Sequence, residues 1–321
     1  MGVEQQDRRA RTVRKARQLL ARGIRRSPRL RLMAERAVSE LERALVAEDL
    51  YSSRYFGTGV HPTDRGKSVS GYAEYRRETS NLNVAAYIVY KHLRPARVVD
   101  IGAARGYLLE ALSEVGVEGH GVDLSHDAIA SASDEVRGRM TVASAVRLPV
   151  VTGAAPVVTA FETLEHLPPH DVSRALAELA RATSAFVVAT IPSFGRNDYG
   201  PNGWYGGKVL WEVLHAYEAL GPDYEGPIPY HDLMRDGENN PIEGHLTIAS
   251  FSWWTKRFAE AGLVRFGKLE EAMNADLGRF GLLGQQIWHL YVAGKPEAEI
   301  PQGASYEEAL RAEEVLDLGR G

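Results

Sequence analysis

Two carboxylates and two imidazoles are the side chains of this chain best suited to metal or acid–base chemistry. Glu162, Glu165 and His166 follow a short apolar run, and offsets of three and four place them on one face if the chain turns helically there. His245 comes much later, just before a strand-like segment. Together they offer oxygen and nitrogen ligands for a divalent cation such as Mg²⁺, Mn²⁺ or Zn²⁺. Without a metal, His166 or His245 would act as general base, with Glu165 as a further catalytic candidate.

A second group of residues, at 96–123, has the pattern of a nucleotide-cofactor cradle. It reads as a strand, a turn of small residues, a helix, a second strand and a terminal acid. Small residues at Gly102, Ala104 and Gly106 let the backbone approach a ligand, and the helix N-terminus presents N–H groups to negative charge. Asp123 is placed to accept hydrogen bonds from the two hydroxyls of a ribose.

The spacing of this turn distinguishes between cofactors. The GxGxxG pattern is absent, which disfavours a nicotinamide oxidoreductase; a purely structural strand–helix turn is the other alternative. Asp100-x-Gly102-x-Ala104-x-Gly106 resembles instead the first motif of the class I S-adenosylmethionine (SAM)-dependent methyltransferases. The middle position of that motif is usually Gly, and the methyl group of Ala104 narrows the approach to the methionine part of the cofactor. The resemblance implies SAM as cofactor and an α/β fold, a Rossmann-like sheet of seven strands whose last strand is antiparallel.

The same resemblance implies where the rest of the cofactor lies. Ser144 stands where the family usually has the Asp that meets the adenine amino group, so Ser144 or the Ala145 backbone is expected to serve. Tyr75 or Arg76 is expected to reach the methionine carboxylate, with packing against the sheet as the alternative. The predicted cofactor-binding residues are Tyr75, Arg76, Asp100, Gly102, Ala104, Gly106, Asp123, Leu124, Ser144 and Ala145.

The Glu-x-x-Glu-His motif with a later His carries a resemblance of its own. It is similar to the metal-binding pattern of the small-RNA 3′-terminal 2′-O-methyltransferases and of the ubiquinone-pathway O-methyltransferases. The implied ligands are Glu162, Glu165, His166 and His245. Glu-His-Leu at this point also occurs in metal-free relatives, where the Glu and His orient loops or act as base. Both roles stay open at this stage.

The elements that must position these residues follow from hydrophobic periodicity. Buried strands are expected at 98–101, 119–124, 157–160 and 186–191, and a long last strand at 285–293. The expected organisation is a basic helical N-terminal arm at 1–48, a cofactor-covering segment at 49–82, a methyltransferase core at 83–295 with a lid insertion at 192–244, and a tail at 296–321.

Composition excludes several classes of protein. Cysteine is absent, which removes disulfides, thiolate metal sites and a Cys nucleophile and is compatible with a reducing cytoplasm. No apolar run approaches the roughly 20 residues that span a bilayer, and the N-terminus lacks a signal-peptide core. We expect a cytoplasmic protein, with peripheral contact at the inner face of the membrane as an option.

Positive charge is concentrated in the N-terminal arm. Residues 8–31 hold eleven Lys or Arg and no acid, whereas the chain after them holds 27 basic and 40 acidic residues. The arm is expected to be an amphipathic basic helix that docks on an anionic membrane surface or self-associates, or simply a solvated face. Nucleic acid is a disfavoured partner, because the core is acidic.

Polar residues outnumber apolar ones in the lid insertion, which favours a polyhydroxylated acceptor over a flat aromatic one; stabilising a long loop is the alternative. The expected function is therefore SAM-dependent O-methylation of a sugar, glycan or glycosylated natural product, with or without a metal. The alternatives are an RNA 3′-end 2′-O-methyltransferase and a non-catalytic cofactor-binding scaffold.

Overall fold

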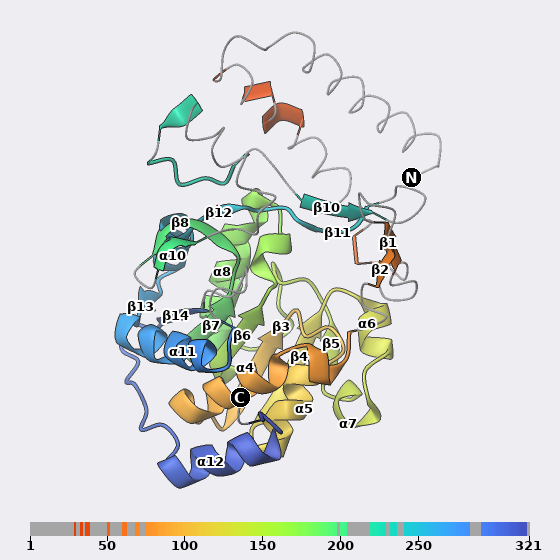
Figure 1. The fold of residues 1–321 in the computed structure, drawn as a ribbon, viewed down its shortest axis with the longest axis vertical. Coiled ribbons are helices and arrows are strands. Elements are labelled where there is room, and N and C mark those ends of the chain that lie inside the picture. Colours follow the sequence, from red (N-terminus) through yellow and green to blue (C-terminus); the bar gives the residue numbers. More distant parts are fainter. Residues whose placement is uncertain are drawn as a thin grey trace.

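One seven-stranded sheet, in the order β13-β14-β7-β6-β3-β4-β5, forms the centre of the molecule (Figure 1). The computed structural model describes residues 29, 33–34, 36–38, 50–51, 60–62, 68–70, 75–197, 200–203, 219–221, 223–228, 232–235, 241–282 and 290–319. The strands of this sheet are β3 (Arg97–Ile101), β4 (Glu118–Asp123), β5 (Met140–Val142), β6 (Ala155–Phe161), β7 (Thr183–Thr190), β13 (Val264–Arg265) and β14 (Leu290–Gly294). Strands β3 to β7 pair in parallel, and β14 pairs antiparallel with β7. The Rossmann-like α/β fold expected from the sequence is confirmed.

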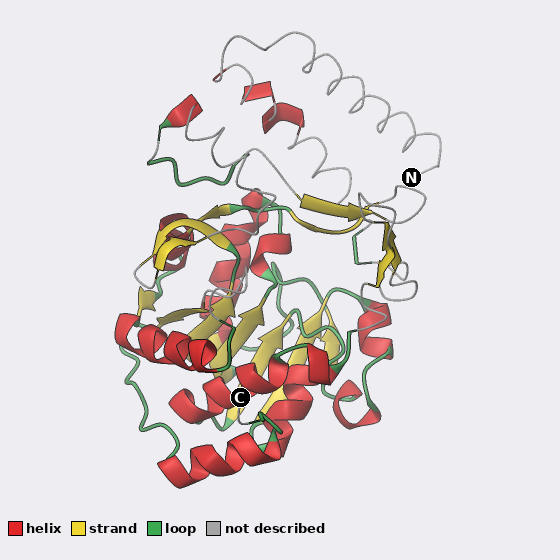
Figure 2. Ribbon diagram, in the orientation of Figure 1, coloured by secondary structure: helices red, strands yellow, loops and turns green. Residues whose placement is uncertain are grey.

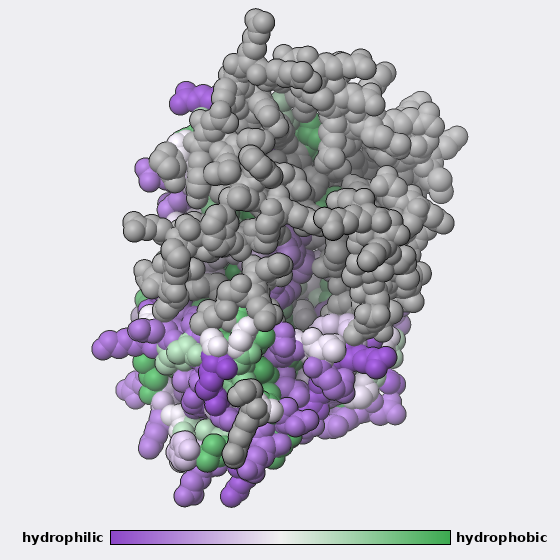
Figure 3. Space-filling view, in the orientation of Figure 1, coloured by the Kyte–Doolittle hydropathy of each residue, from purple (hydrophilic) through white to green (hydrophobic). Residues whose placement is uncertain are grey.

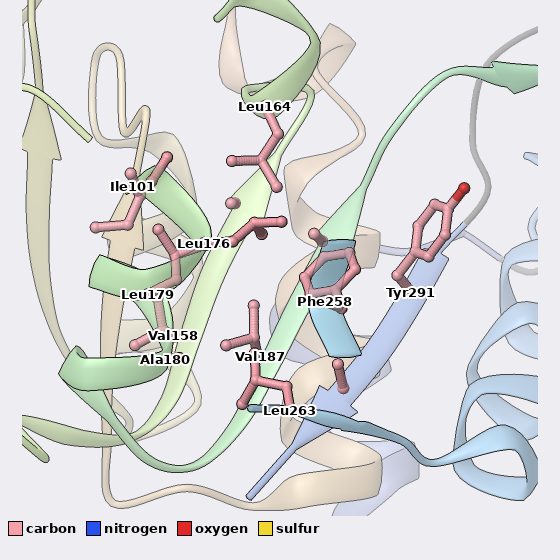
Figure 4. Packing of buried hydrophobic residues seen from close by; sticks show 14 of the residues in the cluster. Ile101, Val158, Leu164, Leu176, Leu179, Ala180, Val187, Phe258, Leu263 and Tyr291 are labelled. Atoms are coloured by element: carbon pink, nitrogen blue, oxygen red, sulfur yellow. The ribbon is translucent and has the colours of Figure 1, made fainter. Parts of the chain in front are cut away.

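Alternating side chains of the strands pack into two hydrophobic cores, one on each face of the sheet. Val98 and Val99, for example, are neighbours in β3 and belong to different cores. Ile101, Leu176 and Phe258 lie in the core between the sheet and helices α8 and α10 (Figure 4). The flanking helices, red in Figure 2, are α4 (Leu82–Leu93), α5 (Tyr107–Glu114), α6 (His126–Ala130), α7 (Asp134–Arg137), α8 (Pro169–Ala182), α10 (Phe251–Glu260), α11 (Gly267–Arg279) and α12 (Tyr306–Val315), with 3-10 turns η1 (Arg77–Thr79) and η2 (Leu164–His166).

Local sequence explains where several of these helices begin. Ser125 caps α6 by accepting a hydrogen bond from the Ala128 amide, and Ser250 caps α10 by accepting one from Trp253. Ser305 and Glu308 form a reciprocal capping box at the start of α12. Serine side chains thus cap three of these helices.

Several short strands in the described part of the chain lie outside the central sheet. These are β1 (Val60–Pro62), β2 (Ser68–Ser70), β8 (Ser193–Asn197), β9 (Gly200–Gly203), β10 (Asp232–Arg235), β11 (Pro241–His245) and β12 (Ala249–Ser250). Strand β8 pairs with β9 and β12, and β10 pairs with β11. Much of the lid, most of the basic arm and residues 285–289 of the expected last strand lie outside the described residues.

A hydrogen bond joins described residues of the arm and the lid: the Arg29 guanidinium donates from Nε to the Ala219 carbonyl at 3.3 Å. Among the residues that the structure describes, no helix is long and apolar enough to cross a membrane.

The described surface in Figure 3 is mostly hydrophilic, with green hydrophobic residues scattered between purple ones. Apolar side chains are thus gathered mainly in the two cores.

The turn after β3 has little room for side chains. Gly102 has a φ of +77°, and a Cβ built on it would lie 2.3 Å from Oγ1 of Thr163. That hydroxyl is fixed, because it donates to the carbonyls of Ile101 (3.1 Å) and Phe161 (3.0 Å). Both the backbone conformation and the packing therefore require glycine at this position.

Replacing Gly102 by Ala is expected to lower the free energy of unfolding by about 2–5 kcal/mol, from about 1–2 for the left-handed backbone and about 1–3 for the overlap. Gly138→Ala is the matched control, since its added Cβ meets nothing within 4 Å and its φ is −66°. Urea unfolding measures both variants. Equal stability of the two would contradict this account of the turn.

A buried carboxyl lies in the middle of the sheet, directly before the same turn. Asp100 is 4% exposed and accepts a hydrogen bond of 2.8 Å from the Thr159 hydroxyl on β6. Burial raises the pKa of Asp100 to about 7; the Thr159 hydrogen bond opposes this shift, and the charge of Asp123 adds to it. Folded protein therefore binds a proton here at pH values where the unfolded chain has lost it.

Stability linked to Asp100 is expected to fall as pH rises from about 4 through about 7, because the folded state holds the proton more tightly than the unfolded state. Asp100→Asn removes this dependence while leaving an acceptor for Thr159. Between pH 5 and pH 8 the stability of the variant relative to wild type should rise, on the order of 2 kcal/mol. Urea unfolding at both pH values measures the difference, and a pH-independent difference would refute the raised pKa.

Candidate functional site

The cradle predicted for a nucleotide-type cofactor is built at the carboxyl ends of β3 and β4. Ala104 has a φ of +48°, and Gly106 has a φ of +78° at the start of α5. The Asp123 carboxylate, at the end of β4, accepts hydrogen bonds from the amides of Ala104 (2.8 Å) and Ser125 (2.7 Å). It remains partly exposed, so it has lone pairs left for ligand hydroxyls. Asp123 thus both closes the turn and faces outward.

Residues beside Asp123 could contact the base of a nucleotide. Leu124 is 60% exposed, an unusual exposure for a leucine next to a buried strand. Ser144 and Ala145 follow the carboxyl end of β5, which pairs with β4. Both are partly buried, and the Ser144 hydroxyl accepts a hydrogen bond from the Val146 amide at 3.4 Å. The predicted adenine contacts therefore lie at the same sheet edge as Asp123.

Tyr75 and Arg76 differ in their placement. The Tyr75 carbonyl accepts hydrogen bonds from Arg105 (3.3 Å) and from the Tyr107 hydroxyl (3.1 Å), and its ring lies 5.1 Å from that of Tyr107. Tyr75 therefore lies against residues of the turn and the start of α5, whereas Arg76 is exposed. Arg105 was not among the predicted site residues, although it stands inside the motif. Asp100 lies behind the turn, bound to Thr159.

The second cluster gathers three of the four predicted metal ligands. One ligand atom each from Glu165, His166 and His245 lies within 4.8 Å of the others. His166 Nε2 is 3.9 Å from Glu165 Oε1, and the two imidazole centroids are 4.9 Å apart. Glu165 is fully buried. Glu162 is not part of this group, and its amide donates to both oxygens of Thr190 at 3.0 Å.

Backbone hydrogen bonds hold the cluster together. The Glu165 carbonyl accepts from the amides of Leu246 (2.8 Å) and Thr247 (2.9 Å), and the Thr247 hydroxyl donates to the Leu167 carbonyl at 2.6 Å. These bonds fix the end of β11 against η2, so that His245 lies beside His166. The whole cluster is next to the cradle, because Thr163 bonds to the Ile101 carbonyl immediately before Gly102.

The electrostatics of the cluster favour neutral imidazoles. Burial lowers the pKa of His166 to about 4, and hydrogen bonds to the carbonyls of Gly244 and Glu162 offset part of that shift. Burial, and then the charge of His166, hold the pKa of His245 well below its usual value. Burial raises the pKa of Glu162 to about 8, opposed by a hydrogen bond from Thr190. At neutral pH both imidazoles therefore have a lone pair, which is the form that ligates metals.

Tyr51 also reaches this cluster, and nothing in its sequence context predicted that. Its hydroxyl is hydrogen-bonded to His166 Nδ1, and its ring meets the His166 ring edge-on with centroids 5.2 Å apart. Tyr51 precedes His166 by 115 residues. No spacing rule could therefore have paired the two.

Comparison with known proteins agrees with the cradle. Residues 98–185 match the family model described as "Methyltransferase domain". A ubiquinone biosynthesis O-methyltransferase of Burkholderia thailandensis is 35% identical over 161 residues, which are 46% of this chain and 60% of the relative. The enzyme of the same name from Methylococcus capsulatus is 33% identical over 102 residues, 30% of this chain and 43% of its own. The chain thus spans less than two thirds of these relatives.

Solved structures of similar proteins include a SAM-dependent methyltransferase from Methanosarcina mazei, at 17% identity with a TM-score of 0.43, covering 62% of this chain and 92% of that one. Another is magnesium protoporphyrin IX methyltransferase from Synechocystis with bound SAH, at 14% identity with a TM-score of 0.40, covering 68% and 83%. The sheet order and the family-model match are both in line with the motif resemblance, and residues 98–185 are similar to a methyltransferase domain.

Proposed function

We propose that the protein is a SAM-dependent O-methyltransferase that acts on a polar, hydroxylated acceptor with the help of a divalent cation held by Glu165, His166 and His245. The observation that carries this proposal is the convergence of those three ligands within 4.8 Å beside the cofactor-type cradle. The names of the relatives, ubiquinone biosynthesis O-methyltransferases, support methyl transfer to oxygen.

The residues of the cradle fit SAM. Asp123 would accept hydrogen bonds from the ribose hydroxyls, and Leu124 would cover one face of the adenine. Ser144 or the Ala145 backbone would meet the adenine edge, and the small residues of the turn would admit the methionine part. Bound SAM supplies a methyl group already activated by the sulfonium. What remains for the protein is to align the acceptor oxygen with that methyl group and to take up the acceptor's proton.

The residues of the second cluster fit a divalent cation. One carboxylate and two neutral imidazoles form a mixed oxygen and nitrogen donor set, and three protein ligands leave positions for oxygens of an acceptor. A bound cation would lower the pKa of a coordinated hydroxyl and orient it. We infer an acceptor with two neighbouring hydroxyls, such as a sugar, a glycan or a glycosylated natural product. The polar composition of residues 192–244 supports the same class.

A metal-free reaction would use the same imidazoles as general base. Burial makes His166, with a pKa of about 4, a weak base at neutral pH. An efficient general base has a pKa near the working pH. Ligation of a cation is therefore the better use of these imidazoles.

Asp123→Ala is expected to weaken SAM binding by about 10- to 100-fold, because hydrogen bonds to a charged group contribute about 1.5–3 kcal/mol each. The SAM affinity of Asp123→Asn should lie between those of Asp123→Ala and wild type, since the introduced amide keeps one acceptor oxygen. Glu118→Ala, at the exposed start of the same strand, is the control and should bind normally. Calorimetry with SAM measures all three, and unchanged affinity in Asp123→Ala would contradict the placement of the ribose.

Chelator-treated protein is expected to bind Mn²⁺ or Zn²⁺ with a distinct isotherm that a Glu165→Ala, His166→Ala double variant loses. His170→Ala removes an exposed imidazole from α8 and should leave the isotherm unchanged. SAM binding without any metal isotherm in wild type would contradict the metal-assisted mechanism. Failure of wild type to bind SAM would contradict the proposed function as a whole.

A further inference from the structure

Leu50 and Tyr51 lie against the end of β11, and Tyr51 is 193 positions from its partner Gly244 in the sequence. Leu50 is 6% exposed and packs on Leu246, which is 1% exposed. Tyr51 follows with a φ of +59°, in the left-handed region that costs a non-glycine residue roughly 1–2 kcal/mol. A backbone conformation of this kind persists only where surrounding contacts fix it. The contacts of Tyr51 should therefore explain why the conformation is kept.

The Tyr51 hydroxyl takes part in a closed hydrogen-bond network with Gly244 and His166. The Gly244 amide donates to the Tyr51 oxygen at 3.3 Å, and the Tyr51 hydroxyl donates to the Gly244 carbonyl at 3.5 Å. His166 Nδ1 lies 3.0 Å from the same carbonyl and is also hydrogen-bonded to the Tyr51 oxygen. The Gly244 carbonyl and the Tyr51 phenol thus both contact a single imidazole nitrogen.

This network favours one tautomer of His166. The Gly244 carbonyl can only accept, and the Tyr51 hydroxyl, which donates to that carbonyl, leaves its oxygen to accept from Nδ1. The two contacts together favour a hydrogen on Nδ1. In a neutral imidazole the hydrogen on Nδ1 leaves Nε2 with its lone pair, and Nε2 is the nitrogen that faces Glu165 at 3.9 Å.

We propose that Tyr51 is a positioning residue that fixes the Nδ1–H tautomer and the ring orientation of His166, so that Nε2 is presented to a divalent cation beside Glu165 and His245. The inference rests on the proposed function, since it assigns a supporting partner to one of the three proposed ligands. It also makes a segment that precedes the methyltransferase core part of the site. Partners of this kind on a ligating histidine typically change metal affinity by about 10- to 100-fold when removed.

Full-length, chelator-treated Tyr51→Phe tests the proposal by calorimetry with Mn²⁺. The variant should bind Mn²⁺ about 10- to 100-fold more weakly than wild type and bind SAM with unchanged affinity. Tyr87→Phe is the matched control, since it also removes a phenolic hydrogen bond, to Glu313 on α12, a helix well away from β11 (Figure 1). It should bind Mn²⁺ as wild type does. Equal Mn²⁺ affinity of Tyr51→Phe and wild type would overturn the positioning role.

A second readout needs neither metal nor activity. Long-range ¹H–¹⁵N spectra of protein labelled with [¹⁵N]histidine, with His166 assigned through a His166→Gln variant, report the tautomer directly. Wild type should show Nδ1–H alone, and Tyr51→Phe a mixture of both tautomers. A wild-type Nε2–H tautomer, or an identical spectrum in Tyr51→Phe, would overturn the inference. Absence of Mn²⁺ binding in wild type, in contrast, would contradict the proposed metal site itself.

Discussion

The backbone carbonyl of Glu165 is the central point of attachment in the candidate site. It accepts hydrogen bonds from the consecutive amides of Leu246 and Thr247, and so attaches the chain after β11 to η2. This attachment brings His245 beside His166, although the two are 79 positions apart in the sequence. Backbone hydrogen bonds, which do not depend on side-chain identity, thus decide which side chains can act together.

Strained backbone gathers at the same sheet edge. Six described non-glycine residues have positive φ, and three of them, Tyr51, Ala104 and Glu162, lie in or beside the cradle and the imidazole cluster. Hydrogen bonds fix each of these three conformations. Tyr51 is bonded to Gly244 and His166, Ala104 to Asp123, and Glu162 to Thr190. Strain maintained by specific partners is typical of sites where position matters more than stability.

Thr163 couples the two halves of the site. Its hydroxyl bonds to the carbonyls of Ile101 and Phe161, at the ends of the adjacent strands β3 and β6, and its side chain occupies the space that a Cβ on Gly102 would need. The cofactor-type turn and η2 therefore cannot shift independently. The proposed methyl-donor and acceptor positions would lie close together because of this packing rather than because of any feature of either half alone.

Sequence by itself determined most strands of the central sheet and the small-residue turn after β3, and it singled out Glu165, His166 and His245 as side chains able to act together. Periodicity along short strands and the small residues of the Asp100–Gly106 turn are local signals, because they reflect the conformation of neighbouring residues. Tertiary structure alone decided that His245 joins Glu165 and His166 while Glu162 stands apart, and that Tyr51 contacts His166. The physical reason is that these contacts depend on loop closure over long stretches of chain, on which local pattern carries no information.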